Sequence, residues 1–370
     1  MITPVVDGDS GFVGVDMRLD PSHLPDGYVA FAENCRFTNG IVEQRRGVAT
    51  MNWGIRSGGV IIPLENAIAA QVFRDPNGVE TVMVAAGSKA YQVAPNNLAR
   101  EIPLPDGEVI GDHAKFVQAF DTVLLLRGED KKPLRLNTRF SVFEFFDKEE
   151  NSIEPDAEEN PRGGTESMPN ASEGIYFSNR VAFVHGRDKV AVSDYLNYTR
   201  YDPVRSEFRI NQGTEDSMVG VAPVDKNTVA FFKENSIYVV RNFQGDLSNA
   251  TLDELTRAYG CVAAGTITRV GRDIVFLSRR GLCSLTVTEQ GEIQGVDVPL
   301  SKPVDPLMQS IDWKHAHNAR CVSHNNKIYL AVPLVTRSEY GITNSGNLFV
   351  SDSGSSFSIT VNSGGDTVSF

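Results

Sequence analysis

The sequence predicts an all-β protein folded as a β-propeller of about six or seven blades, and three observations carry this prediction. Gly (32) and Pro (18) together fill 50 of the 370 positions, which is typical of a chain with many short strands and turns. Short apolar stretches alternate with turns rich in Gly, Asn and Asp, in a unit of strand, turn, apolar strand, turn and strand. These turns recur about every 45 to 55 residues, a period that favours propeller blades over a β-solenoid.

Six copies of this unit can be followed along the chain, and the last is incomplete. They lie at residues 67–93, 115–136, 175–193, 219–240, 265–287 and 320–332. We therefore place the propeller at residues 31–342. The longest interval between turns contains an acidic insertion at residues 147–173, where charge and three prolines predict a solvated loop rather than a dedicated interface.

The N-terminal 30 residues are predicted as an extended arm that precedes the propeller. A short helical turn is expected at residues 28–34, and a hairpin follows it. Asn39-Gly40 between β-prone flanks is typical of a tight type I′ turn, because both residues can take positive φ. A propeller must close its ring, so we expect the hairpin at residues 36–45 and strands near the C-terminus to complete the last blade. Residues 343–370 are predicted as C-terminal strands, with a flexible tail as the alternative.

Two short helices are predicted to decorate the sheets. Thr251 and Glu254 have the spacing of a capping box, and Gly260 can end such a helix in the left-handed conformation. Asp305-Pro306 suits an N-cap followed by proline at the first helical position, and the helix is expected to continue to Trp313.

Composition excludes several classes of protein. The formal net charge of −12 and the pI near 5.1 argue against a protein that grips nucleic acid by neutralising its phosphates. The sequence has no apolar run near the roughly 20 residues needed to cross a bilayer, and its N-terminus lacks a secretory pattern. Four cysteines without a CxxC pair are predicted to be isolated buried thiols, consistent with a reducing compartment: Cys35, Cys261, Cys283 and Cys321.

No catalytic motif stands out, so we predict no enzyme, no catalytic residue, no metal and no cofactor. His315, His317 and His324 could approach a set of metal ligands, but no HExxH motif or carboxylate partner stands at helical spacing from them. The sequence has no G-x-S-x-G elbow, P-loop or G-x-G-x-x-G turn. Asp156 and Glu158 lie in the acidic insertion, where they would position a substrate poorly.

Two regions carry a resemblance to a known family. Residues 14–47 read G-V-D-x-R-x-D-P, then L-P-D-G, then N-x-R-F-x-x-G-x-V-x-x-R-x-G, and residues 257–263 run on into a blade-like segment at 270–278. This resembles the nozzle and hub β-propeller proteins in the tails of short-tailed bacteriophages.

The resemblance implies a non-enzymatic virion protein, assembled in the host cytoplasm into a ring, with sixfold symmetry expected, below the portal and adaptor. Such a ring would hold other tail components and line the channel for DNA ejection. A negatively charged wall would let DNA pass without specific binding.

Five charged residues of the arm and hairpin are predicted to lie at subunit interfaces rather than to act in catalysis. Arginine can form forked hydrogen bonds with acidic groups on a neighbouring subunit. The predicted interface residues are Arg18, Asp20, Arg36, Arg45 and Arg46.

The competing function is a receptor-binding or carbohydrate-binding β-propeller. Tyr195, Tyr198 and Tyr201 follow one another at a spacing of three residues and could form an aromatic platform for a sugar. The same spacing also fits a packed turn, which leaves both readings open.

Overall fold

The computed structural model describes residues 11–45, 53–57, 60–75, 77–139, 141–145, 166–243, 247–287, 293–295, 298–325, 327–335, 340–342, 348–352 and 355–357. The described chain is all-β, with one short α-helix, α1 (Asp305–Gln309), and a few 3₁₀ turns. The predicted fold class is therefore confirmed, and the helix beginning at Asp305 is present although it ends before Trp313.

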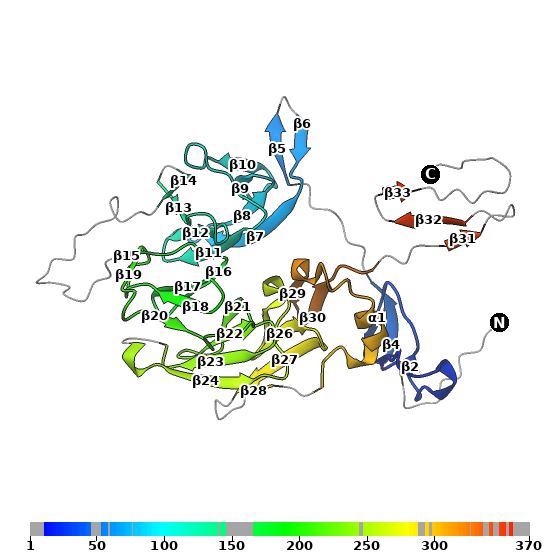
Figure 1. The fold of residues 1–370 in the computed structure, drawn as a ribbon. Helices are drawn as coiled ribbons and strands as arrows, with labels where there is room; N and C mark the ends of the chain where they lie inside the picture. The colour runs from blue at the N-terminus through cyan, green and yellow to red at the C-terminus, as the bar shows by residue number, and fades with distance from the viewer. Residues whose placement is uncertain are drawn as a thin grey trace, which may run out of the picture.

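Five four-stranded antiparallel sheets form the blades of the propeller (Figure 1). Four of them are built from consecutive strands, and the third skips β19 (Arg200–Tyr201), which pairs with β15 (Glu166–Ser167). Blade 1 contains β7 (Ala67–Arg74), β8 (Glu80–Ala86), β9 (Lys89–Val93) and β10 (Ala99–Ile102). Blade 2 contains β11 (Lys115–Ala119), β12 (Thr122–Leu126), β13 (Leu134–Asn137) and β14 (Val142–Phe145). Blade 3 contains β16 (Glu173–Phe177), β17 (Arg180–His185), β18 (Lys189–Val192) and β20 (Glu207–Arg209).

Blade 4 contains β21 (Met218–Pro223), β22 (Val229–Lys233), β23 (Ile237–Arg241) and β24 (Thr251–Thr256). Blade 5 contains β25 (Thr268–Val270), β26 (Asp273–Ser278), β27 (Gly281–Val287) and β28 (Ile293–Gly295). A sixth unit has two described strands, β29 (Arg320–His324) and β30 (Lys327–Ala331). The expected six or seven blades are thus corrected to five complete blades plus this pair.

The core lies between neighbouring blades, and the second strand of each blade carries much of it. All five residues of β12 are buried: Leu124 packs in the cluster shared with blade 3, whereas Leu125 packs in the cluster shared with blade 1. Since side chains alternate between the two faces of a strand, a strand covered on both faces reads as a continuous apolar run. Phe232 of blade 4 and Phe276 of blade 5 meet in the same way, with ring centroids 5.0 Å apart.

The sixth unit is covered on one face only. Cys321 is buried, and Leu330 packs in a cluster with α1 and Leu277 of blade 5. On the opposite face the side chains of Val322 and Tyr329 are 59% and 51% exposed. The pair therefore resembles the inner half of a blade whose outer strands and second covering layer are missing among the described residues.

The N-terminal arm has a defined structure. β1 (Gly14–Val15) pairs in parallel with β2 (Tyr28–Val29), and η1 (Pro21–His23) lies between them. The helical turn predicted at residues 28–34 is therefore wrong at its start, because the backbone of Tyr28 and Val29 pairs with β1. The amide of Met17 donates to the carbonyl of Pro303 over 2.8 Å, which fixes the arm beside the segment that leads into α1.

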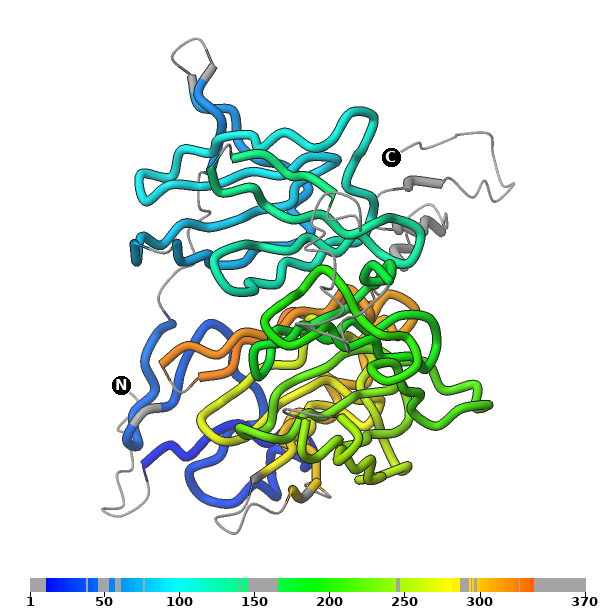
Figure 2. Tube along the Cα trace, turned by 90° about the vertical axis from the view of Figure 1, so that its left-hand side faces the viewer, coloured from blue at the N-terminus to red at the C-terminus, as the bar shows by residue number. Residues whose placement is uncertain are grey.

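The predicted hairpin is confirmed. β3 (Cys35–Thr38) pairs with β4 (Ile41–Gln44), and Asn39 and Gly40 take φ values of 50° and 78° in the turn between them. In Figures 1 and 2 this blue hairpin lies beside the orange segment that holds α1 and the sixth unit. Within the described residues, however, β3 pairs with β4 alone, so the hairpin does not close the last blade by strand pairing as predicted.

The strands near the C-terminus also stay apart from the sixth unit. β31 (Tyr340–Ile342), β32 (Leu348–Asp352) and β33 (Ser355–Phe357) form a separate three-stranded sheet. A further hairpin, β5 (Gly54–Ser57) and β6 (Val60–Pro63), precedes blade 1, and Ile55 packs against the outer face of that blade.

Two further predictions are corrected by the strand pairing. Residues 251–256 form β24 instead of a helix, because Asp253 and Glu254 bond across the sheet to Arg241 at 3.0 Å and Tyr238 at 3.2 Å. Residues 166–173 belong to the predicted acidic loop yet are ordered: β15 (Glu166–Ser167) pairs with β19 (Arg200–Tyr201), and Met168 is buried. Residues 147–165 of that insertion lie outside the described residues.

Candidate functional site

The predicted interface residues of the arm bond within the arm. Arg18 donates to both carboxylate oxygens of Asp16, over 2.8 and 2.5 Å, and these hydrogen bonds lower the pKa of Asp16 to about 2. Asp20 accepts from the hydroxyl and the backbone amide of Ser22, over 2.5 and 2.9 Å, and these contacts lower its pKa as well. Asp16 and Asp20 each also accept a hydrogen bond from a backbone amide two residues later, so these charged contacts stabilise the local backbone conformation of the arm.

The hairpin arginines are arranged in the same way. Arg36 lies directly opposite Glu43 in the register of the hairpin, and its Nε donates to that carboxylate over 2.6 Å. The guanidinium of Arg45 donates to the side-chain oxygen of Asn34 over 3.2 Å. Arg46 lies outside the described residues. The arm and hairpin meet at the bridge between Phe12 and Gly40, so the structure brings the predicted residues into one region but pairs their charges locally.

Exposed apolar side chains are the feature of this region that sequence reasoning missed. Phe31, in the loop between β2 and β3, is 62% exposed, and Ile41, which pairs with Thr38 in the hairpin, is 60% exposed. The other large apolar side chains exposed on the arm and hairpin are Phe12, Val13, Leu19, Tyr28 and Val42. A group of this kind on one region is typical of a surface that another protein covers. The sequence could have indicated this surface, because the hairpin has apolar residues on both faces and is too small to form a core of its own.

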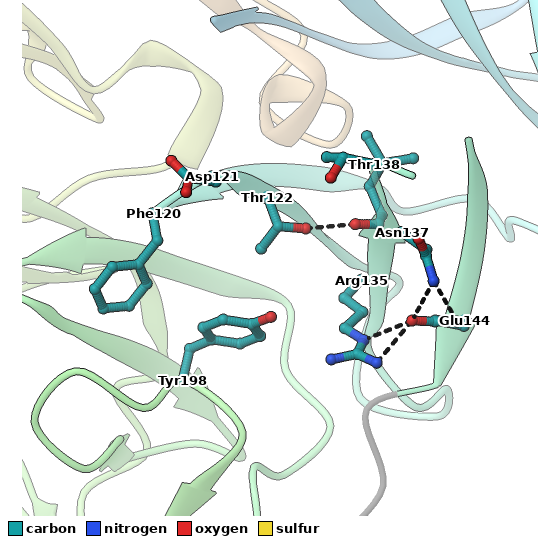
Figure 3. Close-up of a pocket in the computed structure, with 9 residues that line it drawn as sticks. Phe120, Asp121, Thr122, Arg135, Asn137, Thr138, Glu144 and Tyr198 are labelled. Carbon is teal, nitrogen blue, oxygen red and sulfur yellow. Dashed lines mark hydrogen bonds and ion pairs between the residues drawn. The ribbon is translucent and has the colours of Figure 1, made fainter. Parts of the chain in front are cut away.

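The described residues also form a pocket of about 370 Å³ between blades 2 and 3 (Figure 3). Its residues come from the turn between β11 and β12, from the ends of β13 and β14, and from the loop after β18. They are Phe120, Asp121, Thr122, Arg135, Leu136, Asn137, Thr138, Glu144 and Tyr198. Two walls of different chemistry face each other, aromatic on one side and polar on the other.

The polar wall is a hydrogen-bonded network centred on Glu144. Arg135 donates to one oxygen of Glu144 from two nitrogens, over 2.9 and 2.7 Å. The side-chain amide of Asn137 reaches both carboxylate oxygens at 3.2 Å. Charge-assisted hydrogen bonds of this kind fix the three side chains relative to one another.

The aromatic wall comes from Phe120 and Tyr198, whose ring centroids are 6.0 Å apart. Tyr176 supports Phe120 edge-on at 5.1 Å. Phe120 has a φ of 51°, and this left-handed conformation is unfavourable for a bulky side chain, with a cost on the order of 1 to 3 kcal/mol. The ring is therefore held in place by its packing rather than by backbone preference.

The three tyrosines that the competing function would place in a sugar platform do not share one surface. Tyr195 is 53% exposed and accepts a hydrogen bond from Asn179 over 3.2 Å, whereas Tyr198 lines the pocket. Tyr201 is buried, burial raises its pKa, and its hydroxyl contacts Glu207 at 3.4 Å. Only Tyr198 lines a pocket, whereas Tyr195 is exposed and Tyr201 is buried, so the three residues form no shared platform.

The part of the chain that the structure describes holds no group of three or more His, Cys, Asp or Glu side chains able to bind a metal ion. The expectation that no carboxylate stands at helical spacing from the histidines considered as metal ligands is wrong for His315, whose Nδ1 lies 2.6 Å from a carboxylate oxygen of Asp312. This contact lowers the pKa of Asp312. Within the same described ranges, no helix has both the length and the apolarity to cross a membrane.

Comparison with known proteins assigns this chain to no family. No protein-family model and no curated protein matches the sequence. Among solved structures, the chain is similar to the WD40 domain of Pan2 from Neurospora crassa, at 10% identity and a TM-score of 0.38, over 60% of this chain and 63% of that domain. It is also similar to BamB from Moraxella catarrhalis, at 10% identity and a TM-score of 0.37, over 77% and 72%.

A third similar structure is the extracellular domain of a one-component system from B. thetaiotaomicron, at 9% identity and a TM-score of 0.44, over 82% of this chain and 40% of that one. The chain thus spans less than two thirds of the Pan2 and B. thetaiotaomicron structures. At these identities and scores none of the three assigns a function, and the β-propeller fold rests on the five blades themselves.

Proposed function

We propose that the protein is a non-enzymatic structural subunit of a bacteriophage tail, which assembles through its arm, hairpin and sixth unit into a ring below the portal and adaptor. The observation that carries this proposal is the half-covered sixth unit, with its arm and hairpin presenting apolar side chains beside it. The sequence resemblance of residues 14–47 to tail nozzle and hub proteins gives the proposal its biological setting.

The exposed strand pair supports an assembly role on physical grounds. β30 pairs with β29 along one edge, and the described residues place no strand on its other edge. Unpaired strand edges are templates for pairing with another chain, and natural monomers usually protect them. Val322 and Tyr329 add an apolar face next to this edge. A contact between unlike surfaces of successive copies closes into a ring when the rotation between copies permits it.

The charge of the chain supports a channel through which DNA passes. A net charge of −12 would repel the phosphate backbone wherever it is expressed on the channel wall. We expect no salt-sensitive complex between the purified protein and double-stranded DNA in a gel-shift titration. A tight complex that dissociates as salt is raised would contradict this part of the proposal.

The ring can be tested with a surface double variant. We expect the full-length protein to form rings in negative-stain images and a defined oligomer by light scattering, and the Val322→Lys, Tyr329→Lys variant to stay monomeric with an unchanged melting temperature. Val204→Lys is the matched control, since Val204 is an exposed apolar residue in the loop between β19 and β20 (Glu207–Arg209), in blade 3. A wild-type protein that stays monomeric up to its solubility limit, or a double variant that assembles normally, would overturn the proposal.

A further inference from the structure

We propose that the pocket between blades 2 and 3 binds a neutral saccharide, with Tyr198 as the stacking residue and Asn137 and Glu144 as hydrogen-bonding groups. This site is separate from the arm, the hairpin and the sixth unit, so the sugar-binding proposal can be tested independently of ring assembly. The pocket has two opposed walls, a small excess of negative charge, a size that suits a sugar and a strained aromatic residue, Phe120 (Figure 3).

The aromatic wall matches one face of a sugar ring. The face of a phenol or phenyl ring carries partial negative charge, which attracts the partly positive C–H groups that a pyranose presents on its less polar side. Tyr198 and Phe120 lie together along one side of the pocket, and Tyr198 is half-buried. A ring stacked there would cover the aromatic surface and leave its hydroxyl groups directed to the opposite wall.

The polar wall matches those hydroxyl groups. A sugar hydroxyl both donates and accepts, and Glu144 supplies acceptor oxygens next to the donor groups of Arg135 and Asn137. The network already holds these side chains in fixed positions, so little further ordering is required when a ligand binds. Pockets with aromatic surface and a few convergent polar groups are typical of small-molecule sites.

The charge of the lining favours a neutral ligand. Asp121 and Glu144 contribute two carboxylates, against the single guanidinium of Arg135. This leaves one excess negative charge among the lining residues, which disfavours phosphorylated, sulfated and sialylated sugars. A cavity of about 370 Å³ lies near the lower end of the range of roughly 300 to 1,000 Å³ for small-molecule sites, which suits one or two sugar rings.

Phe120 provides an independent indication that the wall is functional. It occupies the first position of the two-residue turn between β11 and β12, where its φ is 51°. Blade 5 makes the corresponding turn between β25 and β26 with Gly271, whose φ is 63°. Blade 3 makes its corresponding turn with Ser178, at a φ of 52°, so no blade but the second places a bulky side chain there among the two-residue turns described. Strained backbone positions cluster at ligand sites, and the conformation of Phe120 supports the assignment in this sense.

The test uses the full chain with two probes. Saturation-transfer NMR with glucose, galactose, mannose and N-acetylglucosamine examines single rings, and an array of neutral and anionic oligosaccharides examines longer ligands. We expect at least one neutral sugar to bind saturably, and both Tyr198→Ala and Asn137→Ala to weaken that binding at least tenfold.

Tyr195→Ala is the matched control, because Tyr195 lies in the same loop and is not part of the pocket lining. It should bind as the wild type does. Asn137→Ala keeps the aromatic packing, so it remains informative if Tyr198→Ala fails to fold. Absence of binding to every neutral sugar, a preference for anionic glycans, or equal binding by wild type and Asn137→Ala would overturn the proposal. Negative-stain images of the pocket variants separate the two proposals. Variants that form rings without binding sugar would leave the proposed assembly intact and would concern the sugar site alone.

Discussion

Replacing Arg127 by methionine tests how strongly a buried guanidinium holds blades 1 and 2 together. The side chain has no solvent exposure and follows directly after β12. It donates twice to the carbonyl of Lys132, over 3.1 and 2.8 Å, once to the carbonyl of Val109 over 3.1 Å, and once to Glu108 over 2.6 Å. These contacts connect the segment between the two blades to the loop between β12 and β13.

The magnitude of the loss follows from what remains after the substitution. Methionine fills much of the volume, and Glu108 can be hydrated because it is 32% exposed. The carbonyl of Lys132 loses both bonds from a charged donor, and hydrogen bonds to charged groups contribute about 1.5 to 3 kcal/mol. Adding the lost pairing with Glu108, we expect about 2 to 4 kcal/mol in the free energy of unfolding.

Thermal unfolding followed by circular dichroism at pH 7 is the assay. With an unfolding entropy of about 2.1 cal/mol/K per residue, this loss lowers the melting temperature of a 370-residue chain by about 3 to 5 °C. Arg74→Met is the control, because Arg74 also pairs with a glutamate, Glu80, but on the open surface. Surface ion pairs contribute little, so its melting temperature should stay near that of the wild type. An Arg127→Met shift no larger than that of Arg74→Met would show that the buried guanidinium contributes no more than a surface ion pair.

Three other predictions concern the cysteines, Lys233 and Gly260. Ellman's reagent should titrate only Cys35 in the native protein at pH 8, because the other three thiols are buried and burial raises the pKa of Cys261 to about 12; a second fast equivalent would contradict this. Lys233 is fully buried in β22, and burial lowers its pKa, so the unfolded chain binds more protons between the folded pKa and 10.5. Stability should therefore rise with pH through that window in the wild type relative to Lys233→Met; a gap between the two melting temperatures that does not change with pH would contradict it. A Cβ at Gly260 would overlap the backbone carbonyl of Lys233, so Gly260→Ala should lose about 1 to 3 kcal/mol on chemical denaturation, whereas Gly14→Ala, with open space at that position, should lose far less. Equal losses for the two glycine variants would argue against the overlap.

The fold class could be predicted because every blade repeats one physical pattern. The buried stretches 123–126, 229–232 and 274–277 are continuously apolar, as expected for strands covered on both faces, and turn residues separate them from their neighbours. The number of blades could not be predicted, because a period counts units without showing whether each has four strands. The sixth unit has the same first two strands as the others, and only the pairing reveals that its outer half is absent from the described sheet.

The helix predicted from Thr251 onward is a strand in the structure, which shows that strand pairing can outweigh a local helix-capping signal. Thr251 and Glu254 satisfy the spacing of a capping box, yet the same spacing is compatible with an exposed outer strand. The free edge of β23 offers a full ladder of backbone hydrogen bonds, and the charges of Asp253 and Glu254 find partners across the sheet. A capping box contributes at one end of a helix only, whereas the ladder with β23 runs along the whole of β24 and hydrogen-bonds alternate residues of that strand.

The candidate surfaces were only partly predictable for a similar reason. The arginines of the arm and hairpin were visible in the sequence, but their local partners, Asp16, Glu43 and Asn34, were not recognised as such. Short-range bonds of this kind use up much of the hydrogen-bonding capacity of a charged group, which leaves less for a neighbouring subunit. The exposed apolar side chains of the arm and hairpin are not covered by neighbouring described residues, so they are the stronger candidates for contacts with another subunit.

The pocket could not be predicted from periodicity, because it joins residues from two blades that are about 60 positions apart. One signal was nevertheless present at the turn between β11 and β12. The unit there repeats a two-residue turn whose first position requires positive φ, and the chain places Phe120 where glycine would be unstrained. Since Gly271 makes the equivalent turn in blade 5, the fold itself does not require an aromatic ring at this point. The backbone cost is offset by what the ring contacts, which is Tyr176, Tyr198 and the apolar cluster shared by blades 2 and 3 on one side and the pocket on the other.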